Sequence, residues 1–266
     1  MSEFFTILSF RMKRGEIRPT TYNNYLRHLK AFFNWCVAEG IIERSPVGTR
    51  KRLPQNGRVI DYSSEDIQAI ITTMERSQVR EGRIPLWHRD RALLILQLET
   101  GLRPSEALSL LVTDMDWNSS VVLVRPEVAK TDRPRRVPFP LAAQRAVESW
   151  LKIRNKYLPN LDQKIAVFCS ESGRRLDARS WQQQLTRYCK RASELAERDI
   201  HIFPYGIRHH FAITYLRNGG PAFKLRGYLG HTTERMMNNY INLARSDVEE
   251  DAEAYSTTRG LKISFR

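Results

Sequence analysis

Two short segments of this chain carry side chains that together can cut a phosphodiester bond without a metal ion. The first contains Arg103 and Glu106, and the second contains Arg208, His231 and Tyr240. A tyrosine phenol can attack phosphorus and form a phosphotyrosine ester, and two arginines can stabilise the negative charge on the non-bridging oxygens. The sequence therefore predicts Tyr240 as the nucleophile, Arg103 and Arg208 as phosphate ligands, and a reaction that needs no cofactor or metal.

Each arginine lies near a predicted helix start. Arg103 precedes Pro104, and the free amide groups and positive dipole end of a helix N-terminus favour an anion there. The planar guanidinium can bind two phosphate oxygens at once, and Glu106, on the same helix face, can orient it. Arg208 is far away in the sequence, so only the fold can bring the two arginines together.

A predicted β-hairpin supplies the acid that this reaction needs. Residues 121–124 and 136–138 have strand-like composition, and the segment between them is rich in turn-forming residues. Lys130 lies at the expected tip, where its ammonium group can donate a proton to the leaving 5′-oxygen. The basic residues beside it suit contacts with the DNA backbone or the minor groove; they are Arg133, Arg135 and Arg136.

These motifs resemble those of the tyrosine recombinases, the phage integrase group. That family has Thr-Gly-Leu-Arg-x-x-Glu, a hairpin lysine, His-x-Leu-Arg-His, Leu-Gly-His and a following tyrosine. The matching segments, in the same order, are Thr100-Gly-Leu-Arg103-Pro-Ser-Glu106, Lys130, Tyr205-Gly-Ile-Arg208-His209, Leu229-Gly-His231 and Tyr240. The resemblance covers about residues 20–245. It implies DNA strand exchange through a 3′-phosphotyrosine intermediate with a free 5′-hydroxyl.

One motif departs from the family pattern at Tyr205, where the family has a histidine that takes part in proton transfer. A phenol has a pKa near 10, so it can donate a hydrogen bond but is a poor base at neutral pH. We expect Tyr205 to face the scissile phosphate and to bond it through the hydroxyl. His209 and His210 are assigned no primary role, because such histidines more often pack or face solvent.

Composition favours a polyanionic partner and a reducing compartment. The 266 residues include 43 Lys and Arg against 29 Asp and Glu, a net charge of +14. The three cysteines are far apart and lack the spacing of a disulfide framework or a zinc site. The N-terminus is a poor signal peptide, and the longest aliphatic run, residues 92–96, is too short to span a bilayer. We expect a cytoplasmic, nucleoid-associated protein that binds double-stranded DNA and no membrane.

Periodicity predicts a mainly α fold with a small antiparallel β-sheet (α+β). A short helical core-binding (SAM-like) domain, residues 1–55, precedes a catalytic domain with a C-terminal tail, residues 56–266. Helices are predicted at residues 19–40, 64–74, 91–100, 104–111, 141–157, 178–198, 206–218, 222–229 and 233–255. An apolar run at residues 165–168 predicts one more strand.

Basic residues of the first domain predict further DNA contacts. Arg27 and Lys30 lie on the polar face of the helix at residues 19–40. The segment at residues 47–60 contains helix breakers and little apolar periodicity, which is typical of a linker. Its cations Arg50, Lys51 and Arg52 can follow a phosphate backbone.

The resemblance also implies assembly. Strand exchange needs four active sites, so we expect a homotetramer on DNA that carries specific recombination sites, with accessory DNA-bending or directionality proteins. The expected role is integration or excision of a mobile element, with residues 246–266 packing on a neighbouring copy. Two alternatives remain open: a DNA-binding member of this fold with weakened catalysis, and a type IB topoisomerase that relaxes DNA without exchanging partners.

Overall fold

The structure is a computed structural model that describes residues 1–54, 61–129, 133–161, 166–230 and 234–244. The chain divides into two compact units, Met1–Val59 and Ile60–Arg266, and each is described separately. Among the described residues, every helix is too short or too polar to cross a membrane.

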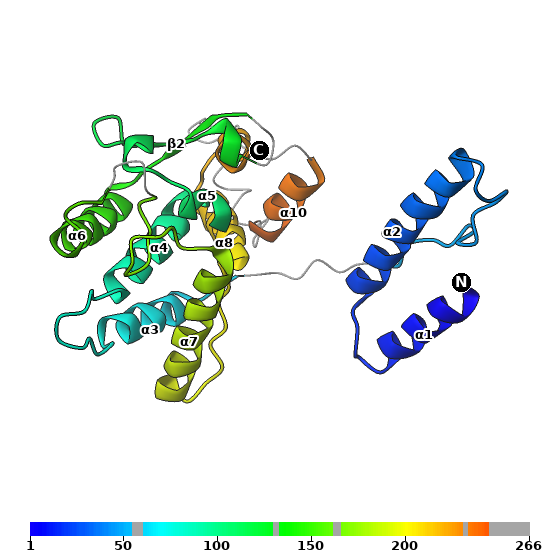
Figure 1. The fold of residues 1–266 in the computed structure, drawn as a ribbon, viewed down its shortest axis with the longest axis horizontal. Coiled ribbons are helices and arrows are strands. Elements are labelled where there is room, and N and C mark those ends of the chain that lie inside the picture. Colours follow the sequence, from blue (N-terminus) through cyan, green and yellow to red (C-terminus); the bar gives the residue numbers. More distant parts are fainter. Residues whose placement is uncertain (55–60, 130–132, 162–165, 231–233, 245–266) are drawn as a thin grey trace, which may run out of the picture. The chain divides into compact units, whose positions relative to one another are not determined.

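The first unit is built on two helices that pack side by side (Figure 1), α1 (Ser2–Lys13) and α2 (Pro19–Ala38). Pro19 occupies the first turn of α2, where its missing amide hydrogen costs no helical bond. Phe5 and Leu8 of α1 are three residues apart, so they share one face and pack against Tyr22 and Leu26 of α2. Helix α1 was not predicted from the sequence.

The predicted linker begins inside this unit, which corrects its expected start. Val47 is fully buried in the core of the unit. The amide of Leu53 donates to the side-chain oxygen of the buried Asn23, and the Asn23 side-chain amide donates to the Leu53 carbonyl, both at 2.9 Å. This reciprocal pair satisfies the backbone of Leu53 and holds the segment on α2, so residues 47–53 belong to the first unit.

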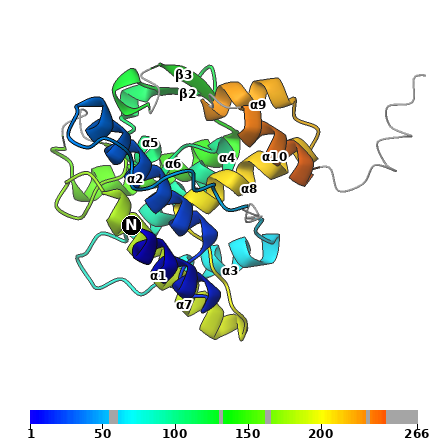
Figure 2. The ribbon, with the colours of Figure 1, turned by 90° about the vertical axis from the view of Figure 1, so that its right-hand side faces the viewer.

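The second unit is mostly helical. Its helix α4 (Trp87–Thr100) is central and packs against α3 (Ser64–Glu75), α6 (Leu141–Tyr157) and α8 (Pro204–Arg217) (Figures 1 and 2). The other helices are α5 (Pro104–Leu108), α7 (Ala178–Ala196), α9 (Ala222–Leu229) and α10 (Glu234–Ala244), with 3-10 turns at Val112–Asp114 and Pro126–Val128. The predicted mainly α fold is confirmed.

Three short strands form an antiparallel sheet in the order β1 (Met115–Asp116), β2 (Val121–Val124) and β3 (Arg135–Pro138). Val122 pairs with Val137, and both are fully buried. Successive side chains of a strand point to opposite faces. Arg135 therefore shares the inner face with Val137, whereas Arg136 lies on the outer face, opposite the exposed Leu123.

One predicted strand is not formed, and the last predicted helix extends beyond the described residues. Residues 166–168 form no strand: the Val167 amide donates to the Leu110 carbonyl at 2.7 Å, and one isolated bridge joins Cys169 to Arg175. Val167 and Phe168 are fully buried, and an apolar run of this length does not distinguish a strand from a buried loop. The last predicted helix is observed as α10, Glu234–Ala244; residues 245–255 lie outside the described residues.

Candidate functional site

The end of α4 lies against α8 because Gly101 has no side chain. Gly101 ends α4 in the left-handed conformation, with a φ of +61°, which glycine adopts without steric cost. A Cβ at this position would lie 2.2 Å from Cδ1 of Phe211 in α8. The close approach allows Nη1 of Arg208, also on α8, to donate to the Gly101 carbonyl at 2.8 Å. Gly101 thus fixes the distance between the two arginine-bearing segments.

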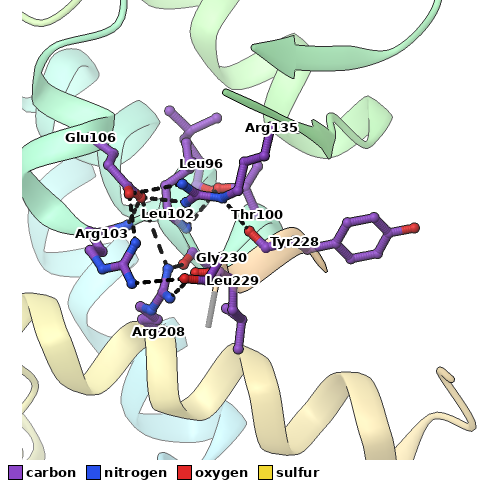
Figure 3. Close-up of polar contacts among 11 residues, drawn as sticks. Leu96, Thr100, Leu102, Arg103, Glu106, Arg135, Arg208, Tyr228, Leu229 and Gly230 are labelled. Atoms are coloured by element: carbon purple, nitrogen blue, oxygen red, sulfur yellow. Dashed lines mark hydrogen bonds and ion pairs between the residues drawn. The ribbon is translucent and has the colours of Figure 1, made fainter. Parts of the chain in front are cut away.

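Glu106 is the fully buried centre of the site (Figure 3). Arg103 caps α5, and its amide donates to Oε2 of Glu106 at 2.8 Å while its Nη1 donates to Oε1 at 2.8 Å. The same carboxylate therefore satisfies a free amide at the helix start and orients the guanidinium. Nη2 of Arg103 lies 3.5 Å from the Gly230 carbonyl, the long end of hydrogen-bond range.

A second arginine binds Glu106 from the sheet. Nη1 and Nη2 of Arg135 donate to the two Glu106 oxygens at 3.0 and 2.6 Å, which is a bidentate pair. Nε of Arg135 donates to the Tyr228 carbonyl at 2.7 Å (Figure 3). Gly230, in the left-handed conformation that ends α9, leaves room for it, because a Cβ there would lie 3.2 Å from Cδ of Arg135. Arg135 therefore joins β3, α5 and the end of α9.

Arg208 reaches the same centre from α8. Its Nη1 lies 4.0 Å from Oε2 of Glu106, and its Nη2 donates to the Leu229 carbonyl. Burial, followed by the charge of Arg103, lowers the pKa of Arg208 to about 9, while Glu106 opposes the shift. At neutral pH the guanidinium is still protonated. Arg103 and Arg208 thus present two neighbouring cationic groups beside Glu106 (Figure 3).

Glu106 remains ionised despite its burial. Burial alone would raise the pKa of this carboxyl, but hydrogen bonds and charge from Arg135, together with the bonds from Arg103, lower it below its usual value. Buried carboxylates that accept several charged hydrogen bonds are stabilised in the ionised form. The negative charge therefore stays in place to hold the guanidinium groups around it.

Tyr240 of α10 packs in an apolar cluster with Ile213 and Leu229. The residue is buried, with 4% of its surface exposed. Its hydroxyl oxygen lies 2.7 Å from Nδ1 of His209, the residue that follows Arg208 on α8. Burial raises the pKa of Tyr240, although the charges of Arg208 and Arg103 act in the opposite direction. The hydroxyl is therefore within the electrostatic reach of both arginines.

The remaining predicted catalytic residues are an exposed tyrosine and two residues outside the described ranges. Tyr205, one turn before Arg208, is an exposed residue, with 56% of its surface accessible. Lys130 and His231 lie outside the described residues. The structure thus brings together Arg103, Glu106 and Arg208 with Tyr240.

Three of the predicted DNA-contact residues make contacts within the protein. Arg135 is directed inward, with only 9% of its side chain exposed and its guanidinium bound to Glu106. In the first unit, Nζ of Lys30 donates to the Arg50 carbonyl at 2.8 Å. The Arg50 guanidinium donates to the Val47 carbonyl at 2.7 Å and lies over the Phe5 ring. The other predicted contacts are exposed; they are Arg27, Lys51, Arg52, Arg133 and Arg136.

Two residues of the site, Arg135 and His209, are missed by the sequence analysis in these roles. For Arg135 the signal was present: the two-residue period of a strand with Val137 inside also places Arg135 inside. For His209 we find no local signal, because its neighbour Tyr240 comes from a different helix. Among the described residues, no group of three or more His, Cys, Asp or Glu side chains is placed to hold a metal ion.

The buried Arg135–Glu106 pair gives a stability prediction. Arg135→Met should lower the free energy of unfolding by about 3 kcal/mol or more, because a buried charge loses a bidentate partner. Urea denaturation of the full chain at neutral pH measures the change. Arg136→Met is the matched control: this neighbour is exposed, so we expect a change within about 0.5 kcal/mol. Equal losses of stability in the two variants would show that the Arg135–Glu106 pair does not stabilise the fold.

Comparison with known proteins identifies the family. Residues 62–247 match the sequence profile of the phage integrase family. The chain belongs to the phage integrase family. It is 29% identical over 235 residues to the tyrosine recombinase XerC of Alcanivorax borkumensis, covering 88% of this chain and 72% of that protein. The XerC of Serratia marcescens is 28% identical over 239 residues, covering 89% and 73%.

Solved integrase-family structures share the fold. The Tn1549 transposon integrase in complex with transposon right end DNA has a TM-score of 0.72 at 20% identity, covering 92% of this chain and 82% of that one. A lambda integrase dimer bound to a core site has a TM-score of 0.68 at 16% identity, covering 91% and 79%. This integrase-family chain is a tyrosine-type site-specific DNA recombinase, as predicted, and the two alternative functions are not favoured.

Proposed function

We propose that this recombinase cuts and rejoins double-stranded DNA through a 3′-phosphotyrosine bond formed by Tyr240. The observation that carries the proposal is the convergence of Arg103 and Arg208 on Glu106, with the Tyr240 hydroxyl inside their electrostatic reach. Two guanidinium groups held by one carboxylate can bind the non-bridging oxygens of a phosphodiester. Glu106 orients them and does not itself touch the DNA.

The proposed reaction has two steps. In cleavage, the Tyr240 oxygen forms a bond to phosphorus and the bond to the 5′-oxygen breaks, with Lys130 donating the proton that this oxygen takes up. In rejoining, the 5′-hydroxyl of a second strand attacks the phosphotyrosine and releases Tyr240. His231 and the hydroxyl of the exposed residue Tyr205 are proposed to donate hydrogen bonds to the scissile phosphate.

The first unit and the hairpin are proposed to hold the duplex. The exposed cations fit this role because phosphate neutralisation releases condensed counterions; they are Arg27, Lys51, Arg52, Arg133 and Arg136. Residues 1–55 would then act as a core-binding domain and residues 56–266 as the catalytic domain. Such phosphate contacts contribute to the affinity for DNA and to the position of the protein along the duplex, but little to sequence specificity.

The competent form is proposed to be a homotetramer on DNA, because exchange of two duplexes needs four nucleophiles. The similar Tn1549 integrase acts for a transposon, which supports integration or excision of a mobile element as the role, with accessory DNA-bending or directionality proteins as further partners. Residues 246–266 lie outside the described residues, and we propose that they link neighbouring copies.

A recombination assay tests the function. Tyr240→Phe protein selects a binding site from a library of randomised duplexes, and two copies of that site are placed in direct repeat on a supercoiled plasmid. Wild-type protein should delete the intervening segment and form new junctions that sequencing detects. Relaxation of the plasmid without new junctions would instead indicate a topoisomerase. Binding without a covalent adduct would indicate a member of this fold that has lost catalysis.

A further inference from the structure

His209 contacts the hydroxyl group of the proposed nucleophile, Tyr240. Its Nδ1 lies 2.7 Å from the Tyr240 hydroxyl, and the two ring centroids are 5.6 Å apart. The contact is made between helices α8 and α10, which pack against each other. Because His209 directly follows Arg208, the backbone that positions the phosphate-binding guanidinium also positions this imidazole.

The protonation states of Tyr240 and His209 indicate which way a proton can move between them. Burial raises the pKa of Tyr240 above its ordinary value despite the opposing charges of Arg208 and Arg103, so the phenol is protonated at neutral pH and must lose its proton to attack. Burial, followed by the charge of Arg208, lowers the pKa of His209. A neutral imidazole has a lone pair on one ring nitrogen, and Nδ1 is the nitrogen that faces the phenol.

We propose that His209 is a catalytic residue: the general base that accepts the Tyr240 proton during strand cleavage and returns it during rejoining. The inference rests on the proposed function of Tyr240. It assigns proton transfer at the nucleophile to position 209, which the family motif places directly after the second arginine. Proton transfer at the leaving oxygen is a separate step that belongs to another group.

The proton and the bonds balance over the whole cycle. The Tyr240 O–H proton moves to Nδ1 as the phenol oxygen bonds to phosphorus, and His209 becomes an imidazolium. The bond between phosphorus and the 5′-oxygen breaks, and that oxygen takes its proton from Lys130. In rejoining, the 5′-hydroxyl attacks and returns its proton to Lys130, while the phenol oxygen takes back the proton from His209. The bound phosphate offsets the repulsion between the imidazolium and Arg208.

Neighbouring residues are less suited to the task. Tyr205 has a mostly exposed side chain, and a phenol is a poor base at neutral pH. His210 is directed elsewhere: its Nδ1 lies 3.1 Å from Oδ1 of Asp61 and accepts from the Tyr62 amide at 3.3 Å. The same substitution can therefore be made at two adjacent histidines, of which one contacts the nucleophile.

The test compares His209→Asn with His210→Asn in the full chain. The asparagine side chain keeps a polar oxygen near the Nδ1 position but cannot accept a proton at neutral pH. Single-turnover cleavage is measured on nicked duplexes of the selected binding site, one with a normal scissile phosphate and one with a 5′-bridging phosphorothiolate. A sulfur leaving group needs no acid, so this second duplex reports only on the nucleophile side of the reaction.

We expect His209→Asn to slow cleavage of both duplexes by about 100-fold or more, the lower end of the range for general acid–base catalysis. His210→Asn should cleave both at close to the wild-type rate. Lys130→Ala should be slow on the normal duplex and fast on the phosphorothiolate. Gel-shift binding of His209→Asn should match wild type, and His209→Gln, which differs in shape, should show the same cleavage defect.

Three outcomes would overturn the inference. Wild-type cleavage rates in both His209 variants would show that the imidazole is not needed. Rescue of His209→Asn by the phosphorothiolate would assign His209 to the leaving group. Lack of any Tyr240 adduct with wild-type protein would remove the nucleophile itself, and only this last result would also refute the proposed function.

Discussion

Tyr240→Phe should abolish covalent attachment to DNA while leaving DNA binding within about twofold of wild type. Only the nucleophilic oxygen is removed. The ring remains packed with Ile213, Leu229 and Met237, so α10 keeps its packing against α8. No other group can form the phosphotyrosine ester, because the proposed reaction has one nucleophile at each cut strand. The amount of covalent adduct should therefore fall below the detection limit of the assay.

Denaturing gel electrophoresis of end-labelled nicked duplex measures the adduct, and a gel shift under native conditions measures binding. Tyr228→Phe is the matched control. The Tyr228 backbone carbonyl, which accepts from Arg135, is unchanged by this substitution, so adduct formation should stay close to wild type. A covalent complex formed by the Tyr240→Phe protein would show that another residue attacks the phosphate.

The second largest effect is expected for Arg103→Ala, which should slow cleavage by about 1,000-fold. Nη1 of Arg103 is held by Glu106, whereas Nη2 lies 3.5 Å from its carbonyl acceptor and can turn to a phosphate oxygen. Arg103 is expected to stabilise the negative charge on the non-bridging oxygens most strongly in the transition state. The cleavage rate should therefore fall far more than the affinity for DNA. Single-turnover cleavage and half-site binding measure the two quantities separately.

Arg125→Ala is the control for Arg103→Ala. It distinguishes the loss of a phosphate ligand from the loss of an ion pair to a buried carboxylate. Nε of Arg125 donates to the buried Asp114 at 3.0 Å, so its removal also leaves a buried carboxylate without an arginine partner. We expect reduced stability but a cleavage rate close to that of wild type in the folded protein. If Arg103→Ala reduced affinity and cleavage by the same factor, Arg103 would serve ground-state binding only.

The residues that could be predicted from the sequence are those whose signal is local. Arg103 and Glu106 are three positions apart at a helix start, and this spacing alone predicts the observed pair. Gly101 and Gly230 end their helices as expected for glycine. The hairpin strands were visible because valines repeat there with strand-like composition.

What could not be predicted depends on contacts between distant segments. His209 and His210 cannot be distinguished from the sequence alone. The packing of α10 on α8 brings His209 within hydrogen-bond distance of the Tyr240 hydroxyl. The Arg50 guanidinium looks like a DNA ligand in a basic run, yet it donates to the Val47 carbonyl and lies over Phe5. The burial of residues 166–168 likewise follows from the surrounding helices rather than from their own periodicity.

The grouping of Arg103, Arg135 and Arg208 around Glu106 has a consequence for how this enzyme can evolve. In the described part of the site, three cations face one anion, so the free protein contains a local conflict of like charges that a DNA phosphate resolves. Active sites often keep such frustration at the expense of fold stability. Selection for heat resistance alone would therefore favour variants that replace Arg208, whose charged form is disfavoured by burial and by the charge of Arg103, and such variants would no longer exchange DNA strands.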